Sequence, residues 1–495
     1  MRLMLGIFAT VLALSAPAGA QGVLKMAVGS NLATLDPARG TNGEEYIYDN
    51  LVFNGLTRMR PDLQVEPELA ERWEYTPDLK TWTFHLRHGV KFHNGRELVA
   101  DDVIKTFERI LDPATAAAPR SNYTMIQKMS APDKYTVRFE LEYPYGGFAD
   151  IMTDRQVKIV PADKIAELPT APIGTGPFAF VSYTQGDRMV LKKFADYFEP
   201  GQPRLDGVEL RIIPEMAVRI AALEAGDVDY VWDLPPEQVE KLKANQKLKI
   251  DSVPTASWDG AILNNAIPPF DDVRVRKALH LAVGKQDIVQ IVLFGFGAPT
   301  HSPIPPNHPF YEKSIAITKS DPAAARKLLA EAGHPQGVKV PLTVPVGRPI
   351  RERLGVAIQQ LAKPAGFDIE IQRVPFARYQ AEISGKAPMY IDGYFARPTL
   401  DTGTHPFYHS TGTWNERLWH YKNPKVDAAL DQARLTADAG QQQALYGEFQ
   451  RLVAEDYPSY IAYAVAFVVA YRADMRDHTT HPMRWVDLRT ASLPK

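Results

Sequence analysis

The sequence contains no cysteine. This absence excludes disulfide bonds, thiol nucleophiles and thiolate metal ligands. It also excludes the lipid anchor of many exported bacterial proteins, which is attached to a cysteine directly after the signal segment. Any chemistry or binding must therefore depend on other side chains.

An excess of one charge is also missing, because 56 basic residues face 58 acidic residues, for a formal net charge of −2. This balance gives no general attraction to nucleic acid or to acidic lipid, and we expect no nucleic-acid partner. After the N-terminal segment, no apolar run approaches the roughly 18 residues that a membrane-spanning helix needs. We expect no later membrane span.

The first twenty residues differ from the rest of the chain. Arg2 precedes the apolar run "LMLGIFATVLAL", which is too short for a stable membrane anchor. The following "SAPAGA" supplies the small residues that signal peptidase prefers. We interpret residues 1–20 as a signal peptide cleaved before Gln21. This predicts a soluble protein of a bacterial periplasm, without a lipid anchor.

Sequence motifs of common enzymes are absent as well. The chain has no G-x-S-x-G elbow, no H-E-x-x-H motif and no Walker loop with its lysine. Residues 174–179, "GTGPFA", resemble a phosphate-binding loop, but Pro177 removes an amide that such a loop needs. The carboxylate pairs Asp101/Asp102 and Asp271/Asp272 precede predicted helices, where capping explains them. We predict no enzymatic activity, no catalytic residue and no cofactor.

Strand-like and helix-like patterns alternate along the chain, which indicates an α/β fold. Residues 81–87 and 135–142 alternate with the period of a strand, and 460–472 form an apolar run that predicts a buried strand. Residues 100–111 and 321–333 have the apolar spacing and end signals of helices. A length of 495 residues predicts two or three domains.

Five segments carry a resemblance to one family. They are "EPELAERWEYTPDLKTWTFHLRHGVKFHNGRELVADDVIKTFERI" (66–110), "IGTGPF" (173–178), "ALEAGDVDYV" (222–231), "NNAIPPFDDVRVRKALHLAV" (264–283) and "DPAAARKLLAEAG" (321–333). In this order and spacing they resemble the solute-binding proteins of peptide, nickel and opine ABC importers, the bacterial extracellular solute-binding proteins of family 5. The similarity covers nearly all of residues 24–470.

The resemblance implies a two-lobe periplasmic-binding-protein fold of class II, of the large peptide-binding type, with an extra subdomain on lobe I. The expected divisions are lobe I from residues 21–58, 178–267 and 471–495, the extra subdomain from 59–177, and lobe II from 268–470. The two lobes would close over a solute about a hinge near residues 264–270 and 470.

The resemblance also implies a function. The protein would capture a small solute, such as a peptide, an opine or an amino-acid conjugate, and deliver it to an inner-membrane ABC permease. We expect it to act as a monomer, and we expect the solute to be bound without being transformed.

Residues 391–403, "IDGYFARPTLDTG", are the main candidate for solute contact. When Gly393 and Tyr394 are placed on the family's Gly-aromatic pair, Arg397 stands at or beside the acid that binds the ammonium group of dipeptides. This change favours an anionic solute, although Asp401 could still supply an acid one turn later. The alternative is that Arg397 forms a structural ion pair with Asp392 or Asp401.

Further candidates come from aromatic and charged residues elsewhere in the chain. Tryptophan offers a flat apolar face and one donor, glutamate could hold an ammonium, and arginine could hold a carboxylate. These candidates are Phe395, Trp232, Trp258, Trp414, Asn42, Glu44, Arg351 and Arg353.

Two other functions remain open from the sequence. His405 and His409 stand four residues apart, so a helix would place both rings on one face, where they could hold a metal. This spacing, with His420 nearby, suggests a receptor for nickel or a metal chelate, although a histidine pair alone is an incomplete site. A secreted hydrolase with an unusual site is the third hypothesis.

Overall fold

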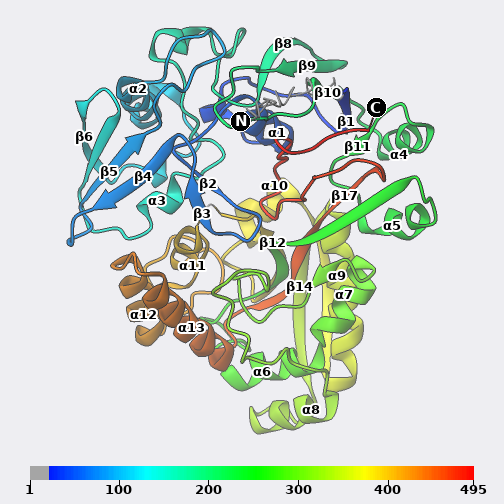
Figure 1. The fold of residues 1–495 in the computed structure, drawn as a ribbon. Coiled ribbons are helices and arrows are strands. Elements are labelled where there is room, and N and C mark those ends of the chain that lie inside the picture. Colours follow the sequence, from blue (N-terminus) through cyan, green and yellow to red (C-terminus); the bar gives the residue numbers. More distant parts are fainter. Residues whose placement is uncertain (1–21, 398, 495) are drawn as a thin grey trace, which may run out of the picture.

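The computed structural model describes residues 22–397 and 399–494. The predicted signal peptide, residues 1–20, lies outside these residues and stays a prediction. In the described part of the chain, no helix is both long and apolar enough to cross a membrane. Helices and strands alternate throughout, which confirms the predicted α/β class (Figure 1).

One large mixed sheet runs through the molecule (Figure 1). In spatial order its strands are β15 (Phe367–Pro375), β14 (Val338–Val346), β16 (Met389–Tyr394), β12 (Leu248–Leu263), β17 (Tyr460–Arg472), β11 (Tyr230–Val231), β1 (Val23–Val28), β10 (Gly207–Ile212), β9 (Arg188–Lys193) and β8 (Phe178–Thr184), and β13 (Gly297–Ala298) pairs with β17. The predicted strand 460–472 is therefore β17, and it lies at the centre of the sheet.

The long antiparallel strands β12 and β17 join two halves of this sheet, which we name lobe I and lobe II. Near one end of the pair, Val253 and Phe467 pack in the core formed with β1 and β10. Near the other end, Ala261 and Tyr460 pack in the core formed with β14 and β16. The two strands therefore belong to lobe I at one end and to lobe II at the other.

The register of β12 against β17 shifts between Pro254 and Trp258, at the point where the core changes. Such an irregularity leaves backbone groups outside the regular ladder and lets a strand bend. We propose residues 254–258, with the facing part of β17, as the hinge. With this hinge, the chain passes from one lobe to the other inside β12 and β17. Both crossing points precede, in the sequence, the predicted boundaries at residues 268 and 470.

Helices cover both lobes. Those of lobe I are α1 (Gly43–Val52), α4 (Met216–Ala225) and α5 (Pro236–Lys243), and those packed on the sheet of lobe II are α6 (Val273–Ala282), α7 (Lys285–Leu293), α8 (Pro322–Glu331) and α9 (Pro349–Ala362). A second group in lobe II contains α10 (Phe376–Arg378), α11 (Leu400–Tyr408), α12 (Pro424–Arg434) and α13 (Ala439–Asp456). The last three of these pack around an aromatic core with Trp419 and Phe449.

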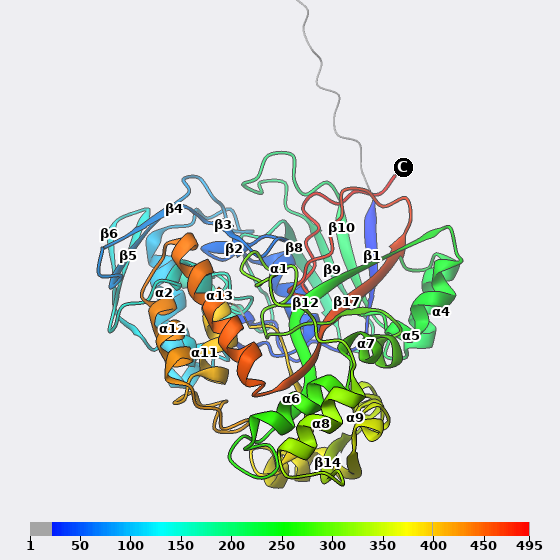
Figure 2. The ribbon, with the colours of Figure 1, turned by 90° about the horizontal axis from the view of Figure 1, so that it is seen from below.

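A separate four-stranded antiparallel sheet forms the extra subdomain, in the order β4 (Ala70–Tyr75), β5 (Thr81–Leu86), β7 (Thr136–Leu141) and β6 (Ile126–Asp133). It is joined by α2 (Ala100–Leu111), α3 (Phe148–Ile151) and the hairpin β2 (Thr57–Met59) and β3 (Val65–Pro67). Its core contains Trp82, Phe107 and Phe139. Viewed from below, α12 and α13 lie beside this subdomain (Figure 2).

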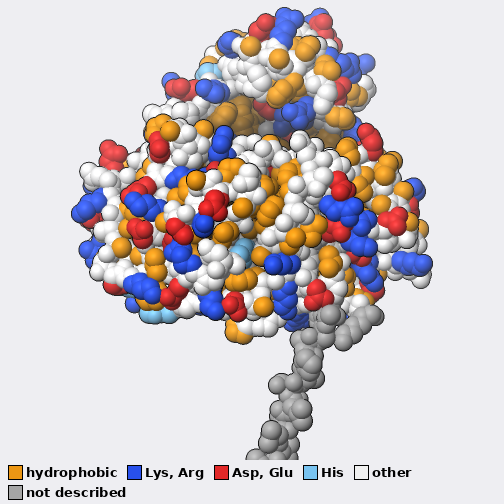
Figure 3. Space-filling model, turned by 90° about the horizontal axis from the view of Figure 1, so that it is seen from above, with side chains coloured by type: hydrophobic (Ala, Val, Ile, Leu, Met, Phe, Trp, Pro, Cys, Tyr) orange, Lys and Arg blue, Asp and Glu red, His pale blue; other side chains and the backbone are white. Residues whose placement is uncertain are grey.

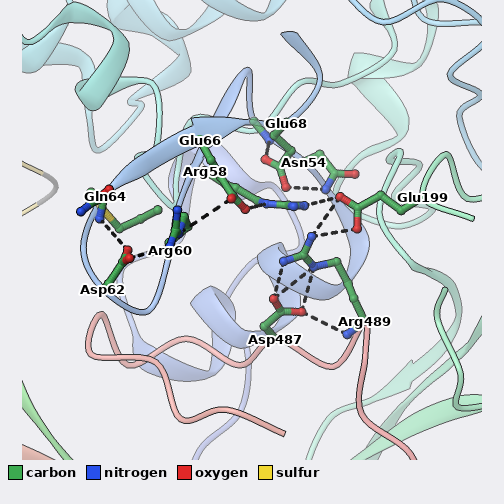
Figure 4. Close-up of polar contacts among 12 residues, drawn as sticks. Asn54, Arg58, Arg60, Asp62, Gln64, Glu66, Glu68, Glu199, Asp487 and Arg489 are labelled. Atoms are coloured by element: carbon green, nitrogen blue, oxygen red, sulfur yellow. Dashed lines mark hydrogen bonds and ion pairs between the residues drawn. The ribbon is translucent and has the colours of Figure 1, made fainter. Parts of the chain in front are cut away.

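A network of ion pairs ties the subdomain to lobe I (Figure 4). Arg58, in the β2–β3 hairpin, binds Glu66 and Glu199, and Glu199 follows β9 of lobe I. Arg489, in the C-terminal tail, donates to both oxygens of Glu199 at 3.0 and 2.9 Å and also pairs with Asp487. Three distant chain segments therefore meet in one half-buried network.

Replacing Arg489 by alanine should lower the free energy of unfolding by about 1–2 kcal/mol, near the lower range for hydrogen bonds to charged groups. The loss leaves Asp487 without this partner and Glu199 with Arg58 alone. Urea denaturation measures the change. Arg378→Ala is the matched control, because Arg378 forms an exposed pair with Glu382 and should change stability by less than about 0.5 kcal/mol. Equal effects in the two variants would contradict this role of the network.

Candidate functional site

A cavity of about 480 Å³ opens where the extra subdomain, lobe II and the C-terminal tail meet. The subdomain contributes Trp73 and Tyr145, the tail contributes Met483, and lobe II contributes Trp258 and Phe407. In the space-filling view, the surface is hollowed between a smaller and a larger body, and hydrophobic and basic side chains gather in the recess (Figure 3). The candidate site is thus an aromatic cavity between parts of the molecule that a hinge could move.

The lobe II wall of this cavity is a cluster of aromatic rings. The ring centroid of Trp258, within β12, lies 5.5 Å from that of Tyr394, at the end of β16. Tyr394 in turn lies 5.0 Å from Phe407 and 5.2 Å from Trp414. These residues come together because β12 and β16 are paired, with Trp258 opposite Tyr394. The predicted Trp258 and Tyr394 therefore line the cavity, with Trp414 behind them.

Phe395 also lines the cavity, and 70% of its surface is exposed. An aromatic side chain left this open next to an aromatic wall is available to cover a ligand. Its predicted role as a solute contact fits this position.

Arg397 lies against the aromatic wall, with its guanidinium carbon 6.0 Å from the Phe407 ring and 5.9 Å from the Trp414 ring. Both acids that flank it in the sequence are engaged by other arginines. Asp392 accepts from Arg351 at 2.7 Å, and Asp401 accepts from Arg434 at 2.6 Å. Among the described residues, Arg397 has neither an ion pair nor a side-chain hydrogen bond, which argues against the structural ion pair considered from the sequence.

Arg155, from the loop after α3, is a second cation near Arg397. Burial, followed by repulsion from Arg155, lowers the pKa of Arg397 from its ordinary value. The guanidinium carbon of Arg155 lies 3.8 Å from the centre of the Tyr46 ring of α1. Arg155 therefore places a second positive charge near Arg397, and an anion bound beside both guanidinium groups would be attracted to each of them.

Asp150 on α3 is a cavity residue that the sequence did not reveal. Within the described chain its carboxylate has no hydrogen-bond or ion-pair partner, and burial raises its pKa to about 7. A cationic group bound beside this carboxylate would stabilise its charged form and lower its pKa. The only sequence signal was an acid inside the apolar stretch "FADIM".

Replacing Asp150 by asparagine should stabilise the protein at pH 8 by about 1–2 kcal/mol, because it removes a poorly solvated charge from a half-buried position. The folded pKa, about 7, lies above the unfolded value, so wild-type Asp150 costs stability progressively as the pH rises from about 4 to about 7. Denaturation curves of both proteins at pH 4 and pH 8 measure the difference. We expect nearly equal stability at pH 4. A constant difference across this range would contradict the titration.

A contact between subdomain and lobe II borders the cavity. Tyr145 donates a hydrogen bond to Asp401 at 3.2 Å, and the Gly146 amide donates to the Arg434 carbonyl at 2.6 Å. A Cβ atom on Gly146 would lie 2.0 Å from the Thr436 carbonyl oxygen, so only glycine permits this approach. Asp401 is thus held by Arg434 and Tyr145 at the cavity edge.

Three predicted contacts lie in the interior of lobe I and outside the cavity. Asn42 caps α1 by accepting from the Glu45 amide at 2.9 Å. Glu44 accepts from the Gly29 and Ser30 amides and holds the chain after β1. Trp232 is covered, and its indole donates to the Arg484 carbonyl at 3.2 Å. Each of these side chains already has a structural role in this arrangement.

Two predicted arginines on α9 also lie outside the cavity. Arg351 donates to Asp259 at 2.9 Å, to Asp392 at 2.7 Å and to the Gly393 carbonyl at 2.7 Å. Arg353 lies over the Phe294 ring, with Glu237 of α5 at 3.8 Å. Arg351 thus supports the strand that carries Tyr394, while Arg353 lies between the lobes away from the cavity.

The glycine loop 174–179 and the segment 92–97 bind each other. His93 bonds the Gly176 carbonyl at 2.9 Å and accepts from the Gly174 amide at 3.3 Å. Both segments therefore belong to the scaffold and lie outside the cavity.

Residues 64–415 of the chain match the family described as bacterial extracellular solute-binding proteins, family 5 Middle. The chain belongs to this family. The protein is therefore a solute-binding protein, and the two-lobe fold expected from the resemblance is confirmed by its structural relatives.

Among curated relatives, the glutathione-binding protein GsiB of Escherichia coli is 29% identical over 468 residues, which cover 92% of this chain and 91% of that protein. The solved structure of DppA from Helicobacter pylori, a periplasmic binding protein in complex with the peptide STSA, has a TM-score of 0.75 and 26% identity, covering 96% of this chain and 99% of that one. AgaA from A. tumefaciens, in complex with agropinic acid, has a TM-score of 0.76 with the same identity and coverage. These family members are binding proteins.

Proposed function

We propose that this solute-binding protein captures a peptide-like solute with at least one anionic group in the periplasm and delivers it to an ABC permease. The observation that carries the proposal is Arg397, whose guanidinium lies against the aromatic wall of the cavity and has no ion-pair partner among the residues that the structure describes. An arginine in this setting suits a carboxylate, which it can bind through two parallel hydrogen bonds.

The other cavity groups narrow the class of solute. Asp150 offers an acid to an ammonium group, while Arg397 offers a donor pair to a carboxylate. The aromatic rings of the cavity provide flat apolar surfaces that can contact many different solute side chains. This combination suits a short zwitterionic peptide or an amino-acid conjugate. A relative named for glutathione, a tripeptide with two carboxylates and one ammonium, supports the same class.

Capture would be coupled to hinge closure through Arg155 and Arg397. Without an anion, the two guanidinium groups repel each other across the cleft. A bound carboxylate would replace this repulsion by attraction to both sides, and so favour the closed form. The permease would then distinguish the closed, loaded protein from the open one.

A thermal-shift screen with the mature protein tests the proposal. The solutes are reduced and oxidised glutathione, dipeptides, tetrapeptides, an opine, and amidated forms of each peptide that lack the free carboxylate. We expect stabilisation by at least one free acid and little by its amide. Mass spectrometry of what co-purifies from a native periplasm provides an independent identification. If no free acid stabilised the protein, or if free acid and amide acted equally, the proposal would fail.

A further inference from the structure

A group of metal-ligating side chains lies on helices α11 and α12. His405 lies in the last turn of α11, and His409 caps the C-terminus of that helix. Their rings stack 4.4 Å apart, at an angle of 6° between their planes. Asp431 of α12 faces both rings, with carboxylate oxygens 3.2 Å from His405 Nε2 and 3.4 Å from His409 Nε2. The sequence suggested the histidine pair but not the carboxylate, which lies 26 residues away from His405.

The spacing of these atoms fits a metal ion. One ligand atom from each of the three residues lies within 4.8 Å of the others. Ligand atoms around tetrahedral zinc lie about 3.3 Å apart, since each zinc–nitrogen bond is about 2.0–2.1 Å. The two histidine-to-aspartate distances are close to this value, each to a different oxygen of Asp431, so rotations of the side chains would bring one oxygen and both nitrogens around a single ion.

The surroundings also orient His409 toward this position. The Thr411 amide donates to His409 Nδ1 at 3.2 Å, and the Thr411 hydroxyl oxygen lies 2.8 Å from the same nitrogen. These two contacts hold the ring so that its Nε2 faces Asp431. Asp431 is the most exposed member, with 56% of its side chain open to solvent, so water can reach a fourth position.

We propose that His405, His409 and Asp431 bind Zn²⁺, with water as the fourth ligand. Two imidazoles and one carboxylate form a ligand set that zinc accepts. None of the three residues lines the solute cavity, whereas Phe407 of α11 and Arg434 of α12 do. The metal site is therefore separate from the solute site. The bound ion would cross-link α11 and α12, two helices of the cavity wall.

Zinc titration of the untagged mature protein, in competition with a chromogenic chelator and without solute, tests the site. We expect one zinc ion per chain, and at least tenfold weaker binding in His409→Ala and in Asp431→Asn. The variant His334→Ala is the matched control, because it removes an imidazole outside the cluster and should bind zinc as the wild type does. Circular dichroism with EDTA present establishes that each variant is folded.

Anomalous diffraction at the zinc edge then locates the ion. A single peak between α11 and α12 is expected. A peak elsewhere, or unchanged affinity in both cluster variants, would overturn the proposal. Absence of zinc binding in the wild type would do the same, and would leave the solute proposal intact, since the titration contains no solute.

Discussion

Replacing Arg397 by glutamate is expected to weaken the binding of an anionic, peptide-like solute at least tenfold, and up to several hundredfold. A hydrogen bond to a charged group contributes about 1.5–3 kcal/mol, and each 1.4 kcal/mol is a factor of ten in affinity. The glutamate also places a like charge beside the solute carboxylate. Isothermal titration calorimetry with the solute identified in the screen measures the loss.

Two controls separate solute contact from a general effect of charge. Arg348→Glu changes the same charge at a residue that lies over Phe376 and does not line the cavity, so affinity should stay within about threefold of the wild type. Arg397→Lys keeps the charge but loses the two-pronged donor geometry, and an intermediate affinity is expected. If Arg397→Glu bound the solute as the wild type does, Arg397 would not be a solute contact.

Replacing Arg351 by alanine is expected to lower the free energy of unfolding by about 3–5 kcal/mol, the cost of leaving buried charges without their partner. Arg351 neutralises Asp259 and Asp392, which both lie in the interior of lobe II. Burial raises the pKa of each acid, and Arg351 opposes this rise. The destabilisation should be larger at pH 8 than at pH 5, because the stranded acids are more fully protonated at the lower pH.

Urea denaturation at the two pH values measures this effect. Arg353→Ala is the matched control on the same helix, since its contact with Glu237 is long and partly exposed, and it should cost less than about 1 kcal/mol. The triple variant Arg351→Met, Asp259→Asn, Asp392→Asn should recover part of the lost stability. An Arg351→Ala protein that kept its stability and lost only solute affinity would instead support the solute contact expected from the family resemblance.

Local sequence patterns predicted the main helices and strands well, because apolar periodicity and end signals lie within each element itself. Helix α2 covers the predicted residues 100–111, with Val103 and Phe107 on its buried face. The position of the hinge was harder to predict. Strand β12 contains Pro254 and polar neighbours, which do not form the pattern of a continuous strand, and the sequence placed the hinge near residues 264–270 instead. Only the pairing with β17 shows where the core changes.

The site was predicted less completely, since its chemistry depends on distant partners. Arg397 is available because Arg351 and Arg434, 41 and 33 residues from the acids they bind, occupy Asp392 and Asp401. No local pattern contains this information. Trp232 failed to reach the cavity for the same reason, because the C-terminal tail covers its indole.

The contacts of Tyr145 with Asp401 of α11 and of Gly146 with the end of α12 have a kinetic consequence. They join the subdomain of lobe I to lobe II beside the cavity, so their hydrogen bonds must break each time the lobes separate there. These bonds do not involve the solute. They should therefore slow release by a similar factor for every solute, so that residence time and affinity can be tuned by different residues.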